Sequence, residues 1–234
     1  MVTTEAGNPL RREIEVMIRE GDLRGLLFQA GALHGHFCNY LAYGVKGAAA
    51  AVRELDVQNT GMEEVVAIVE TNNCLSDGVQ LVSGCTFGNN ALIYKDLGKT
   101  AFTLAKRSGE GVRYVLNPDF ESSRQAAYPQ AYDLWDRLVA QKQAGTPEEF
   151  QRMMGLFHQM ALQEIEVPLE DMFVVEEHRV PMPPSSVMFS SLRCAKCREN
   201  VTENRTRRVG EELLCLSCAE DHVCTVDSRG ISVD

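Results

Sequence analysis

Apolar and polar positions at the start of the chain repeat with the period of a helix. Ile14, Met17 and Ile18 recur among Arg and Glu side chains within residues 10–28, which predicts one or two amphipathic helices. A further helix is expected over residues 39–55, where glycines and alanines form a narrow face that another helix can approach closely. Both segments are expected to pack on the core of the protein.

The pattern then changes to that of a sheet. The β-branched run at residues 64–70 and the apolar run at 91–94 predict strands, and residues 75–83 between them predict a short helix. Residues 100–106 and 112–116 alternate on either side of a Ser-Gly turn, as the strands of a hairpin do. These elements predict the α+β fold class, with a mainly antiparallel sheet packed by helices.

Helical spacing returns in the second half of the main domain. A helix is expected over residues 127–143, and another begins where Thr146 is the N-cap, Pro147 takes the first helical position and Glu149 completes a capping box. Residues 169–180 are expected to form a strand.

Large apolar side chains on these helices are expected to be structural. Trp135 follows the helical pattern and should pack against its neighbours. Met153, Met154 and Phe157 are expected to fill the core or a dimer contact.

A proline- and serine-rich stretch at residues 181–186 is the clearest linker in the chain. It predicts two domains, a main domain over residues 1–184 with a helical extension and a small module over residues 185–234.

Charge and composition narrow the functional classes. The formal net charge of −10 argues against a general nucleic-acid binder, because binding to phosphates needs a surplus of Lys and Arg. No segment has the roughly 20 apolar residues of a membrane span, and residues 1–12 lack the apolar stretch of a signal peptide. We therefore expect a cytoplasmic protein with no membrane partner. In that compartment its eight cysteines are expected to be metal ligands or reactive thiols rather than disulfides.

Four cysteines near the C-terminus have the spacing of a structural zinc site. Cys194-x-x-Cys197 and Cys215-x-x-Cys218 are separated by seventeen residues, as in a zinc ribbon or treble clef. The residues between the pairs are expected to form a hairpin, and a short terminal helix is expected to begin at Ala219. Two disulfides or a redox-active pair are the alternatives, but both need an oxidising or thioredoxin-like setting.

The same module carries a local excess of positive charge, at Arg193, Lys196, Arg198, Arg205, Arg207 and Arg208. Such a cluster is usually solvated surface, and the alternative is contact with nucleic acid, a phosphate or an acidic protein. His222 and Cys224 are spare donors that we expect to be bystanders.

A second group of potential ligands lies in the first hundred residues. His34, His36 and Cys38 alternate, so in an extended segment all three point to one side, and Cys74 and Cys85 flank the expected helix at 75–83. Imidazole and thiolate are the ligands that zinc and similar metals prefer. The spacing leaves two interpretations open, a metal pocket or a set of buried, structural side chains.

The stretches LHGHFCNYLAYGVKGAAAAV and VAIVETNNCLSDGVQLVSGCTFGNNALIYKDLGKTAF carry a family resemblance. Their HGHxC, GCTFG and KDxGKxAF motifs resemble the FmdE family, the E component of formylmethanofuran dehydrogenase, in its longer type with a C-terminal treble-clef zinc finger. The resemblance implies an α+β core that forms a homodimer. It also implies a core metal site with the ligand set His34, His36, Cys38, Cys74 and Cys85, and with Asp77, Gln80 and Thr86 as neighbours.

Two positions depart from the family pattern. Many relatives have Pro-Gly after the HGHxC cysteine, where this chain has Asn39 and Tyr40, and many have Lys where Asn89 stands. These differences are expected to change the shape or charge of the pocket.

Three functional hypotheses follow. The first is a metal-binding accessory protein of molybdenum or tungsten enzymes in one-carbon, methanogenesis-type metabolism, with such an oxidoreductase as partner. It would hold a structural zinc ion in the C-terminal module and a second ion in the core, zinc or another transition metal. The second is an enzyme with an open metal position, for which Cys38 and Asp77 are the catalytic candidates. The third is a regulator that binds nucleic acid or protein through the basic zinc module.

Overall fold

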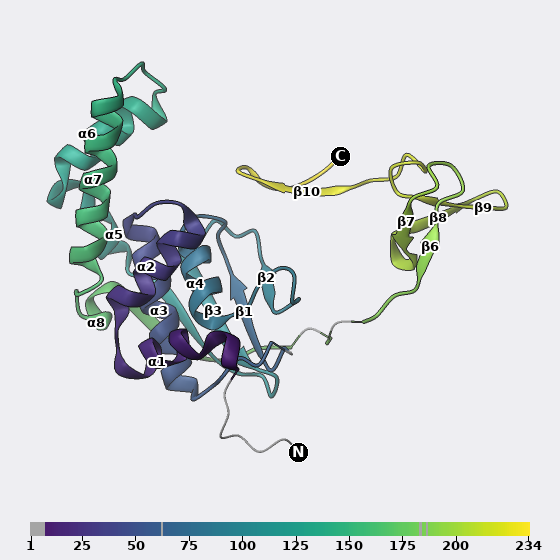
Figure 1. The fold of residues 1–234 in the computed structure, drawn as a ribbon, viewed down its shortest axis with the longest axis horizontal. Coiled ribbons are helices and arrows are strands. Elements are labelled where there is room, and N and C mark those ends of the chain that lie inside the picture. The colour runs from purple at the N-terminus through teal and green to yellow at the C-terminus, as the bar shows by residue number, and fades with distance from the viewer. Residues whose placement is uncertain (1–7, 62, 183, 186) are drawn as a thin grey trace. The chain divides into compact units, whose positions relative to one another are not determined.

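The computed structural model describes residues 8–61, 63–182, 184–185 and 187–234. The chain divides into two compact units, Met1–Met182 and Pro183–Asp234. The first unit is a mixed α+β fold, and the second consists mainly of β-hairpins (Figure 1). No helix of the described residues is long and apolar enough to cross a membrane.

The first unit contains a sheet with the strand order β2-β1-β3-β4-β5. Its strands are β1 Val65–Val69, β2 Leu92–Tyr94, β3 Ala101–Lys106, β4 Glu110–Leu116 and β5 Phe173–Arg179. Strands β1 and β2 are parallel, with α4 between them in the chain, and the other three pairings are antiparallel. The expected α+β class with a mainly antiparallel sheet is therefore confirmed.

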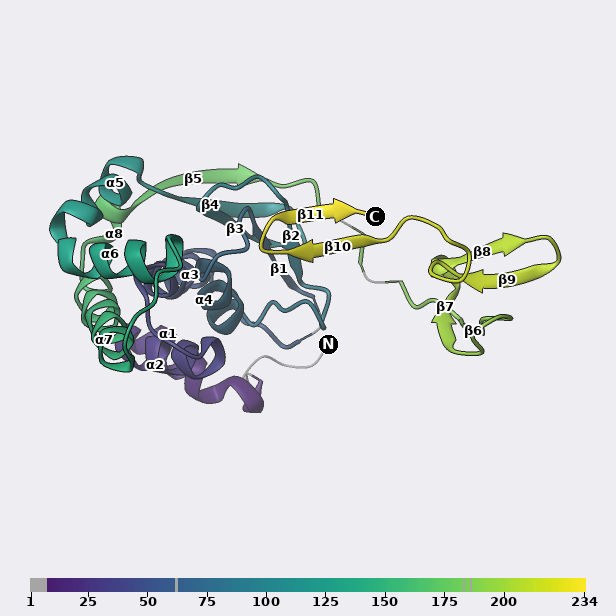
Figure 2. The same ribbon diagram turned by 90° about the horizontal axis from the view of Figure 1, so that it is seen from above.

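Helices of the first unit pack against this sheet and around its end. They are α1 Arg12–Glu20, α2 Leu23–His34, α3 Asn39–Leu55, α4 Leu75–Ser83, α5 Pro118–Ala127, α6 Pro129–Trp135, α7 Pro147–Glu164 and α8 Leu169–Met172, with short turns η1 Pro9–Arg11 and η2 Asp136–Ala140. Figure 2 shows α3 and α4 next to the sheet, with α1 and α2 on their outer side. Helices α6 and α7 lie side by side and project beyond the sheet (Figure 1).

Helix α3 lies at the centre of this unit and is buried along most of its length. It can approach α4 closely because glycines stand at the contact. A Cβ atom at Gly44 would lie 2.1 Å from the carbonyl oxygen of Leu75, and one at Gly78 would lie 2.6 Å from the backbone nitrogen of Val45. The crossing point is near the N-terminus of both helices, so it brings the residues that precede α3 and α4 close together.

Two expected elements differ in the structure. The helix expected over residues 127–143 is shorter: it starts at Pro129 as α6 and ends with the π-helical turn η2 at Ala140. Tyr128, with a non-helical backbone, separates it from α5, a helix that the sequence pattern did not predict. The strand expected over 169–180 starts only at Phe173, after one helical turn.

The start of α7 agrees with the expected capping box. The backbone nitrogen of Thr146 donates to Glu149 Oε2 at 2.9 Å, and the backbone nitrogen of Glu149 donates to Thr146 Oγ1 at 3.3 Å. The Glu149 nitrogen also contacts the Thr146 carbonyl oxygen at 3.1 Å, so the box reinforces the first turn of the helix.

Within its described residues, the second unit contains three two-stranded sheets. They pair β6 Ser191–Arg193 with β7 Asn200–Thr202, β8 Thr206–Val209 with β9 Glu212–Cys215, and β10 Cys224–Asp227 with β11 Gly230–Val233, and the turn η3 Glu203–Arg205 precedes β8. The expectation of a helix from Ala219 is wrong. Residues 216–220 form turns, and the alternating residues after them pair as the β10–β11 hairpin.

Candidate metal centres

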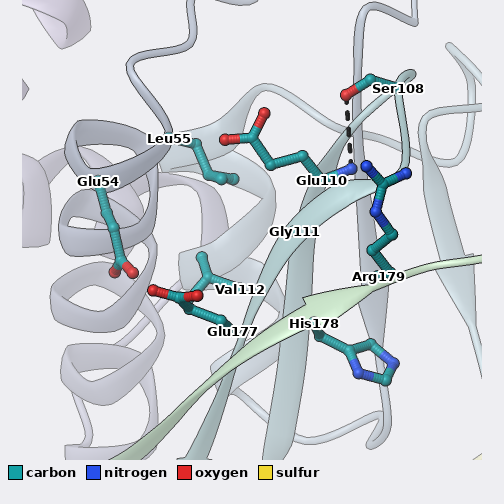
Figure 3. A pocket seen from close by; sticks show the side chains of 9 residues that line it. All are labelled: Glu54, Leu55, Ser108, Glu110, Gly111, Val112, Glu177, His178 and Arg179. Atoms are coloured by element: carbon teal, nitrogen blue, oxygen red, sulfur yellow. Dashed lines mark hydrogen bonds between the residues drawn. The ribbon is translucent and has the colours of Figure 1, made fainter.

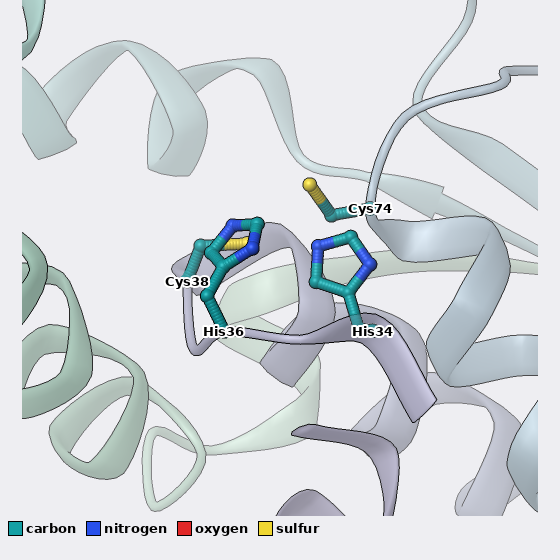
Figure 4. A group of neighbouring side chains, drawn as sticks. All are labelled: His34, His36, Cys38 and Cys74. Atoms are coloured by element: carbon teal, nitrogen blue, oxygen red, sulfur yellow. The ribbon is translucent and has the colours of Figure 1, made fainter. Parts of the chain in front are cut away.

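The first candidate centre lies where three helix ends meet. His34 is the last residue of α2, and Gly35 ends that helix with a φ of 90°, a left-handed conformation that glycine adopts without strain. Cys38 and Cys74 are the N-cap residues of α3 and α4. His34, His36, Cys38 and Cys74 each place one ligand atom within 4.8 Å of all the others. Figure 4 shows their side chains converging from the α2–α3 loop and the start of α4.

Hydrogen bonds orient the His34 ring. Its Nδ1 atom lies 2.7 Å from Asp77 Oδ2, and Asp77 Oδ1 accepts a hydrogen bond of 3.0 Å from Gln80. The other ring nitrogen, Nε2, is buried and has no hydrogen-bond partner among the described residues. A histidine held by a carboxylate through one nitrogen, with the other directed at neighbouring thiols, has the arrangement of a metal ligand.

The electrostatics of the two cysteines differ although their sulfur atoms interact. A hydrogen bond from Cys38, opposed by burial and supported by His34, lowers the pKa of Cys74 to about 6. The same hydrogen bond, together with burial, raises the pKa of Cys38. At neutral pH Cys74 is therefore the thiolate of the pair and accepts a hydrogen bond from the protonated Cys38, and a metal ion that binds both sulfurs must displace the Cys38 proton.

The pKa of His34 is the net result of opposing effects. Burial lowers it, but the hydrogen bond to Asp77 and the charge of Cys74 outweigh burial and raise it. The His34 and His36 rings lie with their centroids 4.3 Å apart, so both imidazoles face the same small space.

The structure does not bring Cys85 to this group. Cys85 follows the C-terminus of α4, whereas Cys74 precedes its N-terminus. A nine-residue helix is about 13 Å long, so residues at its two ends cannot share one ion. The Cys85 thiol is fully buried near the Val65 carbonyl oxygen, at 3.5 Å, and burial raises its pKa to about 11.

Four donors are enough to complete a tetrahedral zinc site. The resemblance implies five ligands, and the enzyme hypothesis an open position, whereas the structure gathers two imidazoles and two thiols, without Cys85. Asp77, a catalytic candidate from the sequence, contacts His34 and Gln80 and does not line the adjacent pocket. Its geometry is that of a group that orients a ligand.

A pocket of about 790 Å³ adjoins this centre. His36, Cys38 and Cys74 line it together with residues of α3, α5, α6, η2 and α7. The helical pattern predicts that Trp135 and Met154 are packing residues, but both line the pocket and remain 43% and 39% exposed. An apolar helix position next to a helix break such as Pro129 is the signal that could have indicated a cavity wall.

A second hollow, of about 600 Å³, lies beside the C-terminus of α3 and strands β4 and β5 (Figure 3). Glu54, Glu110 and Glu177 line it, and His178 points to the other side of β5 from Glu177. Within the described residues, only the two His/Cys groups bring their ligand atoms within 4.8 Å of one another, so these carboxylates do not form a third centre.

The second candidate centre is the four-cysteine group of the C-terminal unit. Cys194 and Cys197 lie in the turn between β6 and β7, and Cys215 ends β9, with Cys218 in the turn that follows. The four sulfur atoms lie within 4.8 Å of one another. Neither His222 nor Cys224 belongs to the group.

Backbone amides point at these sulfur atoms. The nitrogen of Cys215 donates to Cys194 Sγ at 3.4 Å, and the nitrogen of Cys218 donates to Cys215 Sγ at 3.5 Å. Hydrogen bonds from the backbone of Cys215 and Cys197 lower the pKa of Cys194 to about 6. The turns are thus shaped to hold thiolates, and the residues present fit a structural zinc ion.

This chain belongs to the FmdE family, since the family model described as "FmdE, Molybdenum formylmethanofuran dehydrogenase operon" matches residues 33–174, which include all four donors of the core centre. A similar solved structure is that of a tungsten formylmethanofuran dehydrogenase FmdE-like protein from Syntrophus aciditrophicus. Its TM-score is 0.52 at 23% identity, and the match covers 84% of this chain and 91% of that one, which shows a shared fold.

A curated relative from Archaeoglobus fulgidus is named "Probable S-adenosyl-L-methionine-binding protein". It is 36% identical over 217 residues, which cover 91% of this chain. The chain spans only 57% of the length of that relative.

Proposed function

We propose that this chain is a metal-binding accessory protein whose core holds one transition-metal ion, with zinc as the first candidate, between His34, His36, Cys38 and Cys74. The observation that carries the proposal is the buried Nε2 atom of His34, which has no partner among the described residues while Asp77 holds the opposite side of the ring. A buried polar atom without a partner is costly, and a bound ion would satisfy it.

The ion would be held by the ends of three helices, and Asp77 would fix the orientation and tautomer of His34. At Cys38 and Cys74, a bound ion would supply positive charge that keeps both thiols deprotonated. In the C-terminal unit, a zinc ion on the four cysteines would supply most of the folding free energy, because hairpins this short have little core of their own.

The accessory role is supported by membership of the FmdE family, whose description names the molybdenum formylmethanofuran dehydrogenase operon. We include in the proposal a molybdenum or tungsten oxidoreductase of one-carbon metabolism as partner, a homodimer, and a cytoplasmic setting that keeps the ligand thiols reduced.

Metal analysis of the purified full-length protein tests the core site. The wild type is expected to hold two metal equivalents. Cys74→Ser is expected to lose the core equivalent alone, whereas the matched variant Cys85→Ala keeps both. The site proposal fails if Cys74→Ser retains two equivalents, or if Cys85→Ala loses one while its fold is intact by circular dichroism.

Complementation tests the accessory role separately. In a host that carries a molybdenum or tungsten formylmethanofuran dehydrogenase, deletion of this chain is expected to lower the activity of that enzyme. Wild type should restore the activity and Cys74→Ser should not. Full activity in the deletion strain would refute the accessory role and leave the metal site standing.

A metal-dependent enzyme is the second candidate function, and the pocket at Cys38 and Cys74 is the observation that favours it. Because four protein donors complete a tetrahedral site, a substrate would have to add a fifth ligand or react at a thiolate. The name of the archaeal relative makes S-adenosylmethionine the first compound to test for turnover by the metal-loaded protein. Absence of any turnover would leave the accessory role as the better account.

A further inference from the structure

We propose that the pocket beside Cys38 and Cys74 binds a planar heteroaromatic ligand of about nucleoside size. The inference rests on the proposed function only where the pocket meets the proposed metal ligands. The walls themselves belong to residues outside the four-donor group, so binding can be measured independently of the ion.

Flat rings from three helices form the walls of the pocket. Tyr40 comes from α3, Tyr132 and Trp135 come from α6, and Phe157 comes from α7. Tyr132 and Phe157 pack edge to face, with ring centroids 5.9 Å apart, which holds both rings in place. Rings that are already fixed favour a flat ligand, because stacking on them costs little further ordering.

The tyrosine rings are also held through their hydroxyl groups. Tyr40 donates a hydrogen bond of 2.6 Å to Glu121, and the Tyr132 oxygen accepts one of 3.3 Å from Asn39, a residue that is itself buried. Asn39 also donates to Tyr43 at 3.1 Å. Asn39 and Tyr40, the two residues that depart from the family pattern, thus shape the wall nearest to Cys38.

Outside the four-donor group, polar side chains border the apolar walls at Gln125 and Asp136, and Asp136 also accepts a hydrogen bond of 2.6 Å from Gln141. An aliphatic ligand would make no hydrogen bond to these groups, and a fully polar ligand would gain nothing from the rings. A ring system with nitrogen and oxygen atoms along its edge satisfies both. The volume of about 790 Å³ lies within the range of small-molecule sites.

Trp135 is the only tryptophan of the chain and provides a built-in reporter. Adenosine is titrated into the full-length, zinc-loaded protein while tryptophan fluorescence and the heat of binding are recorded. We expect saturable quenching with a dissociation constant below about 1 mM. Cyclohexanol and ribose, which lack an aromatic ring, are expected to give no saturable change.

Two glutamate substitutions on α7 provide the matched comparison. Met154 lines the pocket, whereas Phe150 lies one turn earlier on the same helix, is 40% exposed and does not line it. Met154→Glu is expected to weaken adenosine binding at least about tenfold, because it places a charge against the apolar wall. Phe150→Glu should change binding by less than about twofold. Val139→Glu, which changes a lining residue of η2, replaces Met154→Glu if that variant fails to fold.

Several results would overturn the inference. These are no saturable response to adenosine at millimolar concentration, an equal response to cyclohexanol, or equal weakening by the two glutamate variants. Shielding of Trp135 from acrylamide in the ligand-free protein would also overturn it, since the chain itself or a second copy would then fill the pocket. Metal content measured on the same samples separates the two proposals. Two metal equivalents without adenosine binding would refute only this inference. Adenosine binding by protein that lacks the core metal equivalent would refute only the metal site.

Discussion

Removal of the carboxylate of Asp77 isolates what the hydrogen bond to His34 contributes to the core centre. In Asp77→Ala the ring loses its 2.7 Å partner at Nδ1, so its orientation and tautomer are no longer set. Loss of a carboxylate that orients a ligand histidine usually lowers metal affinity by about 10–100-fold. The Asp77 side chain is 36% exposed, so water replaces part of the lost interaction. We therefore expect about a 10- to 30-fold loss, equivalent to about 1.4–2 kcal/mol.

Competition of the protein with a chromophoric zinc chelator measures this change. The C-terminal centre is an internal control, because it shares no residue with Asp77 and should keep its affinity. Gln80→Ala is the matched variant, since it removes the 3.0 Å hydrogen bond to Asp77 but leaves the contact between Asp77 and His34. It should weaken the core site by less than about threefold. Unchanged core affinity in Asp77→Ala, or equal weakening of both centres, would refute the reasoning.

Four further predictions concern stability and pH. In chemical denaturation, Gly44→Ala should lower the free energy of unfolding by about 1–3 kcal/mol, because its Cβ would overlap α4. Gly155→Ala, with open space around it, should raise that free energy by up to about 1 kcal/mol. Equal effects of the two substitutions would contradict the close approach of α3 and α4. Thr146→Ala should lower the free energy of unfolding by about 1 kcal/mol through loss of the N-cap, and no change would contradict that role. Cys194→Ser should abolish hydrogen-exchange protection in the C-terminal hairpins and leave that of the first unit intact. His34 binds metal only when neutral, and its pKa is raised, so the affinity of the core site for metal should fall as pH drops through that raised pKa. Chelator competition across a pH series measures this affinity. A constant affinity would argue against His34 as a ligand.

Local spacing was enough to predict the C-terminal centre. The two CxxC pairs each form one turn, and the hairpin β8–β9 between them returns the chain to the first pair. His34, His36 and Cys38 also lie within one short loop, so their convergence needs no long-range information. Cys74 joins them only because α3 and α4 cross near their N-termini, which one sequence does not show.

The wrong prediction for Cys85 and the unpredicted pocket have physical causes as well. Cys74 and Cys85 look equivalent along the chain, but the helix between them carries their thiols to opposite ends. The pocket was missed because Trp135 and Met154 have the helical spacing of core residues. Their exposure depends on where α6 and α7 project beyond the sheet, and that follows from the break at Pro129 rather than from periodicity.

The close approach of α3 and α4 at Gly44 and Gly78 also bears on how the first unit resists unfolding. An ion bridging Cys38 and Cys74 would act as a cross-link across about 36 residues, in addition to the packing of the two helices. In the loop-closure model of a cross-link, such a loop restricts the unfolded chain by roughly 4 kcal/mol. Gain or loss of the ion would thus change the lifetime of the folded core. The supply of metal in the cell would then affect how quickly the protein is degraded.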